Sequence, residues 1–202
     1  MRIGIIGTGH MAKALGTAWV RAGHDVAIAG RSPGKAQALA DESGAGAVPL
    51  EEVAVGRDAV LVVVPWDAAE HMVALADVPD GTALIDATNA VEHGVGTLVI
   101  GPGESMAGRI AQAAPGAHVV KAFHTFPFMR WTQPSEGRAP IVLMCGDDPG
   151  ALETVGDLAR DLGGEPVVLG GLDRARQSEE VAGFIIGMAF AGHDPSAAVP
   201  AA

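Results

Sequence analysis

The sequence predicts an α/β fold in which helices cover a doubly wound, mostly parallel sheet, with extra C-terminal strands and a C-terminal helix. A short apolar run, residues 3–6, stops at a glycine-rich turn, and apolar positions then recur at helical spacing. A second run, residues 58–64, is almost continuously apolar, as expected for a central parallel strand buried on both faces. Strand, helix and strand within about 30 residues form one βαβ unit. These three observations are typical of a Rossmann-like domain.

The composition excludes several classes of protein. Hydrophobic residues make up 49% of the chain and charged residues 18%, so a large buried core is expected and disorder is not. Lys and Arg total 13 against 24 Asp and Glu, a formal net charge of -11, which disfavours a nucleic-acid partner. Cys145 is the single cysteine, so an internal disulfide is excluded, and no metal site is expected. Because it lies in an apolar run, Cys145 is expected to be buried. Neither a membrane span nor a signal peptide is recognised, so we expect a soluble, cytoplasmic protein.

The turn after the first predicted strand has the pattern of a dinucleotide-binding site. Gly7 permits a tight turn, Gly9 lets the backbone approach a pyrophosphate, and Ala12 is the small residue where helix packs on strand. A helix that begins near Gly9 would direct its free N–H groups and its positive dipole end at that anion. The residues predicted to contact the cofactor here are Gly7, Thr8, Gly9, His10 and Met11.

The end of the second strand, residues 26–29, indicates which dinucleotide is bound. An NAD site usually has a carboxylate here, and this chain has none. Arg31, Ser32 and Lys35 offer two positive charges and a hydroxyl, which suit a ribose 2′-phosphate. NADP(H) is therefore favoured over NAD(H); the alternative is that Arg31 and Lys35 are solvated surface charges.

The strand predicted over residues 58–64 ends beside the expected site. Ligands of open α/β sheets bind at the carboxyl ends of the strands, so Val64, Pro65 and Trp66 are expected beside the nicotinamide ribose. Trp66 is alternatively a hydrophobic cover for the next helix, which Asp67 is expected to cap.

A fourth strand is predicted over residues 82–88. Asn89 follows its end and is expected to hydrogen-bond the nicotinamide half of the cofactor. Residues 90–104 are glycine-rich and predict an irregular loop at the edge of a cleft. Ser105 is expected to cap a helix over residues 106–114.

Aromatic residues cluster after the strand predicted over residues 118–123. The stretch from residue 126 to residue 131 holds two phenylalanines and a tryptophan, and Phe123 lies three residues before it. Such a run after a strand end favours a wall for a flat ring. The alternative is a hydrophobic plug or a dimer patch. The remaining predicted elements are a strand over 141–145, a helix over 150–162 capped by residues 147–149, a strand over 166–169 and a helix over 173–191.

Taken together, these motifs resemble those of the coenzyme F-420-dependent NADP reductases. The resemblance rests on residues 7–12, 30–32, 64–66, 119–125, 145–148, 170–172, 175–176 and 179. It implies one NADP-binding Rossmann-like domain over residues 1–202, with a dinucleotide-binding core over 1–125 and an extension over 126–202 that completes the substrate pocket. The pattern is also similar to the cytoplasmic reductase domain of the six-transmembrane metalloreductases, which bind a flavin.

The resemblance implies hydride transfer between NADP(H) and a deazaflavin, coenzyme F-420. Phe123, His124, Thr125 and Pro127 would form the floor under the second ring. Direct transfer between stacked rings requires no acid or base, so no catalytic residue is named, and His124 is the only candidate, as a donor to the acceptor ring. Arg130 or Arg138 would receive the charged tail of the deazaflavin. A homodimer is an expectation at the level of the family.

Two other functions remain open on the sequence. One is an NADPH-dependent reductase of another small molecule (a flavin, imine or carbonyl compound); reduction of an imine or carbonyl needs a proton donor near the nicotinamide, where His124 and Thr125 are the polar candidates. The other is a non-catalytic NADP(H)-binding protein that uses the aromatic stretch as a protein interface.

Overall fold

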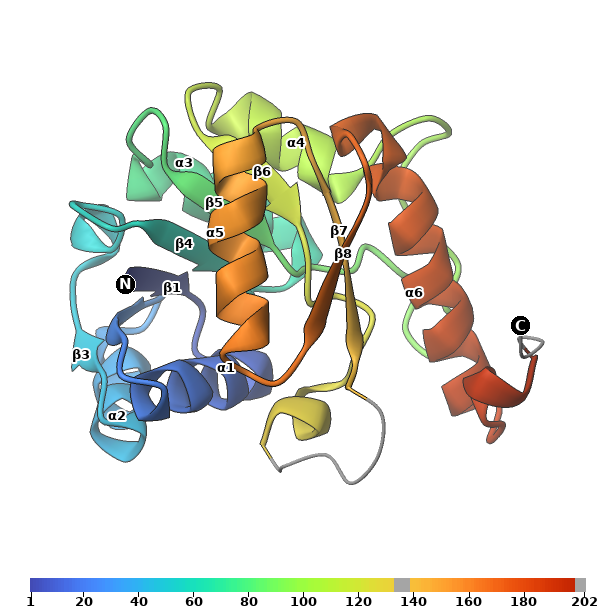
Figure 1. The fold of residues 1–202 in the computed structure, drawn as a ribbon, viewed down its shortest axis with the longest axis horizontal. Helices are drawn as coiled ribbons and strands as arrows, with labels where there is room; N and C mark the ends of the chain where they lie inside the picture. The colour runs from blue at the N-terminus through green and yellow to red at the C-terminus, as the bar shows by residue number, and fades with distance from the viewer. Residues whose placement is uncertain (133–138, 199–202) are drawn as a thin grey trace.

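The computed structural model describes residues 1–132 and 139–198, which form one eight-stranded sheet with helices on both faces (Figure 1). The strands lie in the order β3-β2-β1-β4-β5-β6-β7-β8, and every neighbouring pair is parallel except β6 and β7. The strands are β1 (Arg2–Ile6), β2 (Asp25–Ala29), β3 (Gly46–Ala47), β4 (Ala59–Val62), β5 (Ala83–Asp86), β6 (His118–Lys121), β7 (Ile141–Gly146) and β8 (Glu165–Gly170). The predicted fold class is confirmed.

Helices α1 to α5 lie in connections between strands, and α6 follows the last strand. They are α1 (His10–Arg21), α2 (Pro33–Ser43), α3 (Trp66–Ala76), α4 (Met106–Ala113), α5 (Pro149–Arg160) and α6 (Ala175–Phe190). Short 3-10 turns lie at Leu50–Glu52, Phe128–Trp131, Leu172–Arg174 and Pro195–Ala198. None of the helices in the described part of the chain is both long and apolar enough to cross a bilayer.

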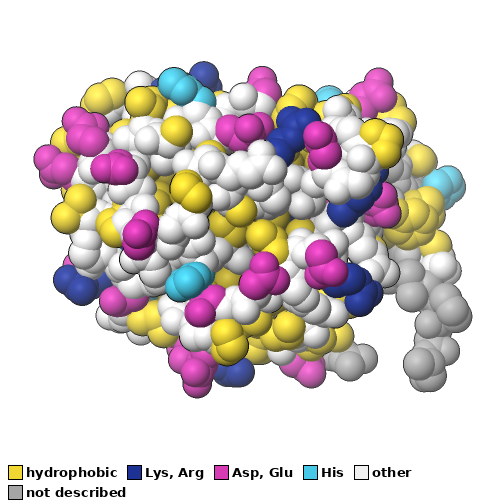
Figure 2. Space-filling model, turned by 90° about the horizontal axis from the view of Figure 1, so that it is seen from above, with side chains coloured by type: hydrophobic (Ala, Val, Ile, Leu, Met, Phe, Trp, Pro, Cys, Tyr) yellow, Lys and Arg dark blue, Asp and Glu magenta, His cyan; other side chains and the backbone are white. Residues whose placement is uncertain are grey.

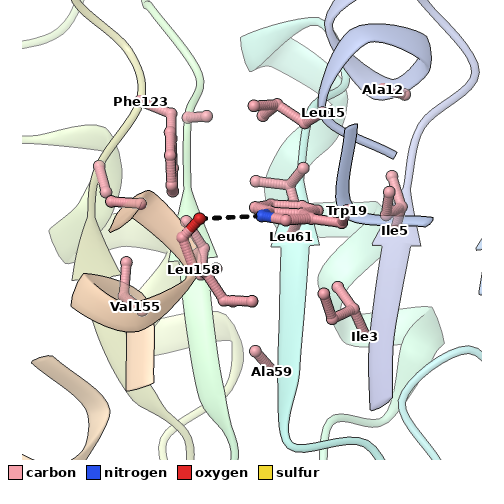
Figure 3. Packing of buried hydrophobic residues seen from close by; sticks show 14 of the residues in the cluster. Ile3, Ile5, Ala12, Leu15, Trp19, Ala59, Leu61, Phe123, Val155 and Leu158 are labelled. Atoms are coloured by element: carbon pink, nitrogen blue, oxygen red, sulfur yellow. Dashed lines mark hydrogen bonds between the residues drawn. The ribbon is translucent and has the colours of Figure 1, made fainter. Parts of the chain in front are cut away.

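Two hydrophobic cores lie on opposite faces of the sheet because alternate strand residues point to opposite sides. In β4, Ala59 and Leu61 pack with α1, α2 and α5, whereas Val60 and Val62 pack with α3 and α4. The indole Nε1 of Trp19, on α1, donates to the carbonyl oxygen of Leu158, on α5, at 3.1 Å, and so joins two helices within the first core (Figure 3). The unbroken apolar run of β4 is therefore needed to serve both cores.

Several element boundaries differ from those that the sequence predicts. The first turn of α3 begins at Trp66, so Asp67 lies inside that turn and does not cap the helix. The last long helix begins at Ala175, after a 3-10 turn that contains Asp173. Strand β3 pairs with β2 over only two residues, too short to be predicted from periodicity. Two predicted caps are confirmed: Ser105 Oγ accepts from the N–H of Gly108 at 3.0 Å, and Asp148 Oδ1 from that of Ala151 at 2.8 Å.

The loop over residues 90–104 docks on α6 through glycines. A Cβ atom on Gly183 would lie 2.3 Å from the carbonyl oxygen of Gly96, and one on Gly187 would lie 2.5 Å from that of Val95. Both distances are shorter than real Cβ contacts, so the backbone of the loop can approach α6 only because both helix positions are glycine. The loop thereby lies beside the helix at the β7–β8 end of the sheet (Figure 1).

On the face that carries α3 and α4, the acidic side chains do not gather into one concentrated acidic patch. Figure 2 shows acidic side chains spread over this face, with basic side chains interspersed among them. This distribution is in keeping with the formal net charge of -11. The carboxyl ends of the parallel strands, where ligands of such sheets bind, carry the groups described next.

Candidate functional site

The backbone at the end of β1 can be formed only with glycine at position 7. Gly7 has a φ of 144°, and a Cβ atom there would lie 2.4 Å from the carbonyl oxygen of Val63. Its N–H donates to the carbonyl oxygen of Ala29 at 2.8 Å, which ties the turn to the end of β2. Gly7 therefore packs three strand ends together and shapes the turn.

Gly9 leaves open space where a ligand would approach. Apart from Gly9 itself and its two chain neighbours, no atom of the described residues lies within 4 Å of the Cβ position of Gly9, in contrast to Gly7. Gly9 precedes α1 in an extended conformation, no side chain caps this end, and the first turn contains no acidic residue. The exposed N–H groups at His10 and Met11 and the positive end of α1 therefore favour an anion at this place.

The end of β2 adds positive charge to the same hollow. Arg31 and Lys35 are exposed, and neither forms an ion pair within the described residues. Ser32 precedes α2 without using its side chain to cap that helix, so its hydroxyl is available to a ligand. A cavity of about 570 Å³ contains these three residues together with Gly7, Thr8 and Gly9. The structure thus brings the two predicted halves of the anion site together.

The cofactor cavity continues in two directions. Toward the sheet centre it reaches Val64 and Pro65, which are expected beside the nicotinamide ribose. Trp66 does not line this cavity and packs against the core under α3. This position corresponds to the alternative interpretation of Trp66, as a hydrophobic cover for the helix. Over the first turn of α1, a second cavity of about 310 Å³ shares Thr8 and Gly9 with the first and extends to His10. Met11 lies half-buried in the same turn and lines neither cavity.

Asn89 and His124 connect the ends of β5 and β6. The side-chain amide of Asn89 donates to the main-chain oxygen of His124 at 2.8 Å. Its other side-chain atom, Oδ1, is buried and has no hydrogen-bond partner among the described residues. A buried unpaired acceptor is costly, so this oxygen is suited to accept from a ligand N–H.

The ring of His124 is neutral at physiological pH. Burial, and to a lesser degree the nearby charge of Lys121, lower the pKa of His124 to about 3, while backbone groups of Ser178 and Ala122 act in the opposite direction. Its two ring nitrogens make no hydrogen bond of good geometry in the described part of the chain. A histidine with so low a pKa is a poor general acid near neutral pH, although a neutral ring still carries one N–H donor.

The aromatic stretch turns inward to a greater extent than the sequence predicts. Phe123 is only 1% exposed, and its ring contacts Trp19 and Trp131 edge-on at centroid distances of 5.8 and 5.5 Å. Phe123 therefore lies in the core of this structure, and its expected place under a ligand ring stays a prediction. Thr125 is also buried, whereas Pro127 is exposed and precedes the 3-10 turn.

The rest of the aromatic stretch lies against α1. The ring of Phe128 stacks on that of His10 at 4.9 Å with an interplanar angle of 21°. A cavity of about 330 Å³ lies between α1 and the 3-10 turn. Arg130 lines a smaller cavity of about 220 Å³ nearby, together with Arg21; Arg138 lies outside the described residues. The aromatic residues thus serve both the core and the surface beside the cofactor site.

Sequence reasoning missed a buried charged cluster beneath the site. Lys121 Nζ lies 2.9 Å from Asp86 Oδ2 and 3.1 Å from Glu179 Oε1, and all three side chains are fully buried. Lysine and aspartate are rarely buried unless they are paired. A charged residue inside each of two apolar strands was the available signal, whereas the pairing itself depends on the tertiary fold.

The N-terminal part of the chain matches a known family. Residues 2–90 match the profile of the family described as NADP oxidoreductase, coenzyme F420-dependent. These residues include the turn after β1, the end of β2, the end of β4 and Asn89.

Three individual proteins are similar to the chain. Metalloreductase STEAP3 of Rattus norvegicus is 30% identical over 184 residues, which is 89% of this chain and 36% of the relative, so the chain spans about a third of the length of that protein. The structure of a protein from Arthrobacter sp. FB24, described provisionally as an F420-dependent NADP reductase, has a TM-score of 0.82 and 23% identity, covers 96% of both chains and supports the fold. A hypothetical protein, SMa0349 of Sinorhizobium meliloti, is 28% identical with a TM-score of 0.75, over 87% of both chains.

Proposed function

Because the chain belongs to the family described as NADP oxidoreductase, coenzyme F420-dependent, we propose that it transfers a hydride between NADP(H) and a deazaflavin, coenzyme F-420. The observation that carries the NADP half is the cavity of about 570 Å³ in which an open glycine turn faces Arg31 and Lys35. Two positive side chains without ion-pair partners among the described residues, in a chain of net charge -11, favour a ligand with an extra phosphate.

The binding residues divide the dinucleotide among the ends of four strands, β1, β2, β4 and β5. Gly9 and the first turn of α1 would bind the pyrophosphate, because their N–H groups are free and no Cβ blocks the approach. Arg31, Ser32 and Lys35 would bind the 2′-phosphate. Val64 and Pro65 would contact the ribose next to the nicotinamide, and Asn89 Oδ1 would accept from the carboxamide N–H₂.

The chemistry belongs to the bound rings, and the chain contributes position. When bound, NADPH supplies a hydride from the nicotinamide, the deazaflavin ring takes it up together with a solvent proton, and NADP⁺ and the reduced deazaflavin result. The contribution of the chain is to hold the two rings at the transfer distance, since proximity and orientation supply most of the rate. His124, neutral and buried, is not needed as an acid.

The assignment of the acceptor rests on the family. Pro127 and Phe128 are the members of the aromatic stretch that reach the surface near His10. Arg21 and Arg130, beside the smaller cavity along α1, are the positive groups that would meet the charged tail of a deazaflavin. The homodimer expected from the family stays a prediction.

Reduction of a flavin is the second candidate function. It is favoured by the 30% identity that the chain shares with a metalloreductase over 89% of its length. A flavin accepts a hydride through the same ring-to-ring geometry, so the proposed NADP(H) contacts would be unchanged. Reduction of an imine or carbonyl is less well supported, because the low pKa of His124 makes it a poor proton donor.

An acceptor assay separates these candidates. NADPH is mixed with the protein and with oxidised F-420, FMN or a cyclic imine in parallel reactions, and the absorbance of each acceptor is followed. We expect F-420 to bleach in step with NADPH oxidation and much faster than the other acceptors are reduced. Faster reduction of FMN would assign the flavin function. Tight binding of NADPH without turnover of any of the three would favour a binding protein.

A further inference from the structure

We propose that Lys121 is a positioning residue that, together with Asp86 and Glu179, fixes the nicotinamide end of the cofactor site. This inference rests on the proposed function, because it concerns how the same site is held in shape. Lys121 is fully buried, does not line the cofactor cavity, and would act through the backbone that carries Asn89.

The ammonium group of Lys121 has three acceptors around it. Nζ lies 2.9 Å from Asp86 Oδ2 on the neighbouring strand and 3.1 Å from Glu179 Oε1 on α6. It also donates to the main-chain oxygen of Thr88 at 2.6 Å. The contacts with Asp86 and Thr88 are hydrogen bonds, and Glu179 adds an ion pair. The contact with Thr88 is the informative one, because it reaches past the end of β5 to the backbone that leads into the site.

Asp86 fixes the same backbone from the other side. Its second oxygen, Oδ1, accepts from the N–H of Thr88 at 2.8 Å and from the hydroxyl of Thr88 at 2.7 Å. The residue after Thr88 is Asn89, whose side chain donates to the main-chain oxygen of His124 at 2.8 Å. The ends of β5 and β6 are thus bridged twice, first by Lys121 and Thr88 and then by Asn89 and His124.

Glu179 connects this bridge to two helices. Its carboxylate, on α6, accepts from the N–H groups of Met106 at 3.0 Å and Ala107 at 3.3 Å, which are the first residues of α4. A carboxylate at a helix N-terminus is stabilised by both the free N–H groups and the helix dipole. Through Glu179, the positions of α4 and α6 determine where Lys121 holds the strand end.

Stability alone does not account for this arrangement. A buried ion pair is often no more stabilising than apolar residues of the same volume, and here one ammonium is shared by two carboxylates. The cluster lies at the carboxyl end of the central strands, where ligands of such sheets bind. From this cluster, a series of contacts leads through Thr88 to Asn89, whose Oδ1 is buried and has no hydrogen-bond partner among the described residues. A rigid backbone at Thr88 keeps that acceptor in place before the cofactor arrives.

Two ligands and two variants test the proposal. NADPH reaches the nicotinamide end of the site, whereas adenosine 2′,5′-bisphosphate occupies only the end near Arg31. Lys121→Met removes the ammonium and retains much of the side-chain volume. We expect this substitution to weaken NADPH binding about tenfold, which corresponds to the loss of one well-placed hydrogen bond. Binding of adenosine 2′,5′-bisphosphate should change less than about twofold. If Lys121→Met does not fold, the milder Glu179→Gln is expected to show the same selectivity to a smaller degree.

Hydrogen exchange provides a readout that needs no cofactor. In the free protein, Lys121→Met or Glu179→Gln should accelerate amide exchange in a peptide spanning residues 86–92 more than elsewhere in the sheet. Ile3→Ala is the matched control, because Ile3 is also fully buried but lies near the start of β1, away from the carboxyl ends of the strands. Equal weakening of both ligands, unchanged binding of both, or uniformly faster exchange would overturn the positioning role. If the wild-type chain binds neither ligand, the proposed function fails and the exchange result alone decides the role of Lys121.

Discussion

The side chain of Asn89 hydrogen-bonds the main-chain oxygen of His124 at 2.8 Å and so joins two parallel strand ends at the centre of the sheet. One half of the Asn89 amide is used in this contact, and the other half, Oδ1, has no partner among the described residues. The contact also holds the backbone from which the buried ring of His124 extends. Strand ends at the centre of a doubly wound sheet are its usual ligand site, so this pair marks where the cofactor chemistry is expected.

Selectivity for the 2′-phosphate is tested at Arg31. Arg31→Ala removes a charged donor, so the Michaelis constant for NADPH should rise about 10- to 100-fold while that for NADH changes less than about twofold. Steady-state kinetics with both cofactors check this. Arg160→Ala, an exposed arginine on α5, is the control and should change neither constant. Equal effects of Arg31→Ala on the two cofactors would contradict the 2′-phosphate assignment.

Gly9 and Gly7 are expected to respond differently to alanine. Gly9→Ala places a methyl group in open space, so the melting temperature should be almost unchanged while NADPH affinity falls about tenfold or more. Gly7→Ala forces a Cβ atom to within 2.4 Å of Val63 and a side chain into a φ of 144°, so it should destabilise the fold itself. Thermal melts and NADPH titrations separate the two effects. A Gly9→Ala variant that binds NADPH normally would refute a close approach of the pyrophosphate.

The buried ring of His124 should make stability depend on pH. The pKa of His124 in the folded protein, about 3, lies below the unfolded value of about 6.5. The unfolded chain therefore binds the proton between these values, and the stability contributed by the neutral ring, fully present above pH 6.5, is lost as the pH falls. Between pH 7 and pH 5 the free energy of unfolding should decrease by about 2 kcal/mol more in the wild type than in His124→Asn.

Urea unfolding at the two pH values measures this difference. The exposed His71 provides the control, because His71→Gln should retain the pH dependence of the wild type. Parallel pH dependence in the wild type and in His124→Asn would mean that His124 takes up its proton as readily in the folded chain as in the unfolded chain, and the lowered pKa would have to be abandoned.

The docking of the loop over residues 90–104 is tested at Gly183. A methyl group at Gly183 would clash with Gly96, so Gly183→Ala should reduce the free energy of unfolding by about 1–3 kcal/mol and expose the loop to proteolysis. Val181→Ala, on an exposed position of the same helix, should leave the cleavage rate unchanged. Identical cleavage of the two variants would show that the loop does not depend on this contact.

The N-terminal half of the site was predictable because its signals are local. The turn at Gly7 and the charges at Arg31 and Lys35 follow directly from strand ends that hydrophobic periodicity locates. Their meeting in one cavity follows from the rule that parallel strands carry their carboxyl ends on one edge.

The remaining features depend on tertiary contacts or on single backbone angles. Phe123 has a φ of 62°, an uncommon value for a bulky residue, and its ring lies in the core beside Trp19, which an aromatic run alone does not predict. The partners of Lys121 come from residues 35 and 58 positions away along the chain. The approach of Gly96 to α6 likewise joins distant segments.

Direct hydride transfer between the two rings is the central claim, and deuterium tests it most directly. NADPH labelled with deuterium at C4, in separate samples for each face, is reacted with oxidised F-420 and stoichiometric protein, and the mass of the reduced deazaflavin is measured. The account predicts that one of the two labelled samples passes its deuterium to the deazaflavin without loss to water. Reduced F-420 that carries no deuterium from either sample, or no reduction by a chain that binds NADPH, would contradict it.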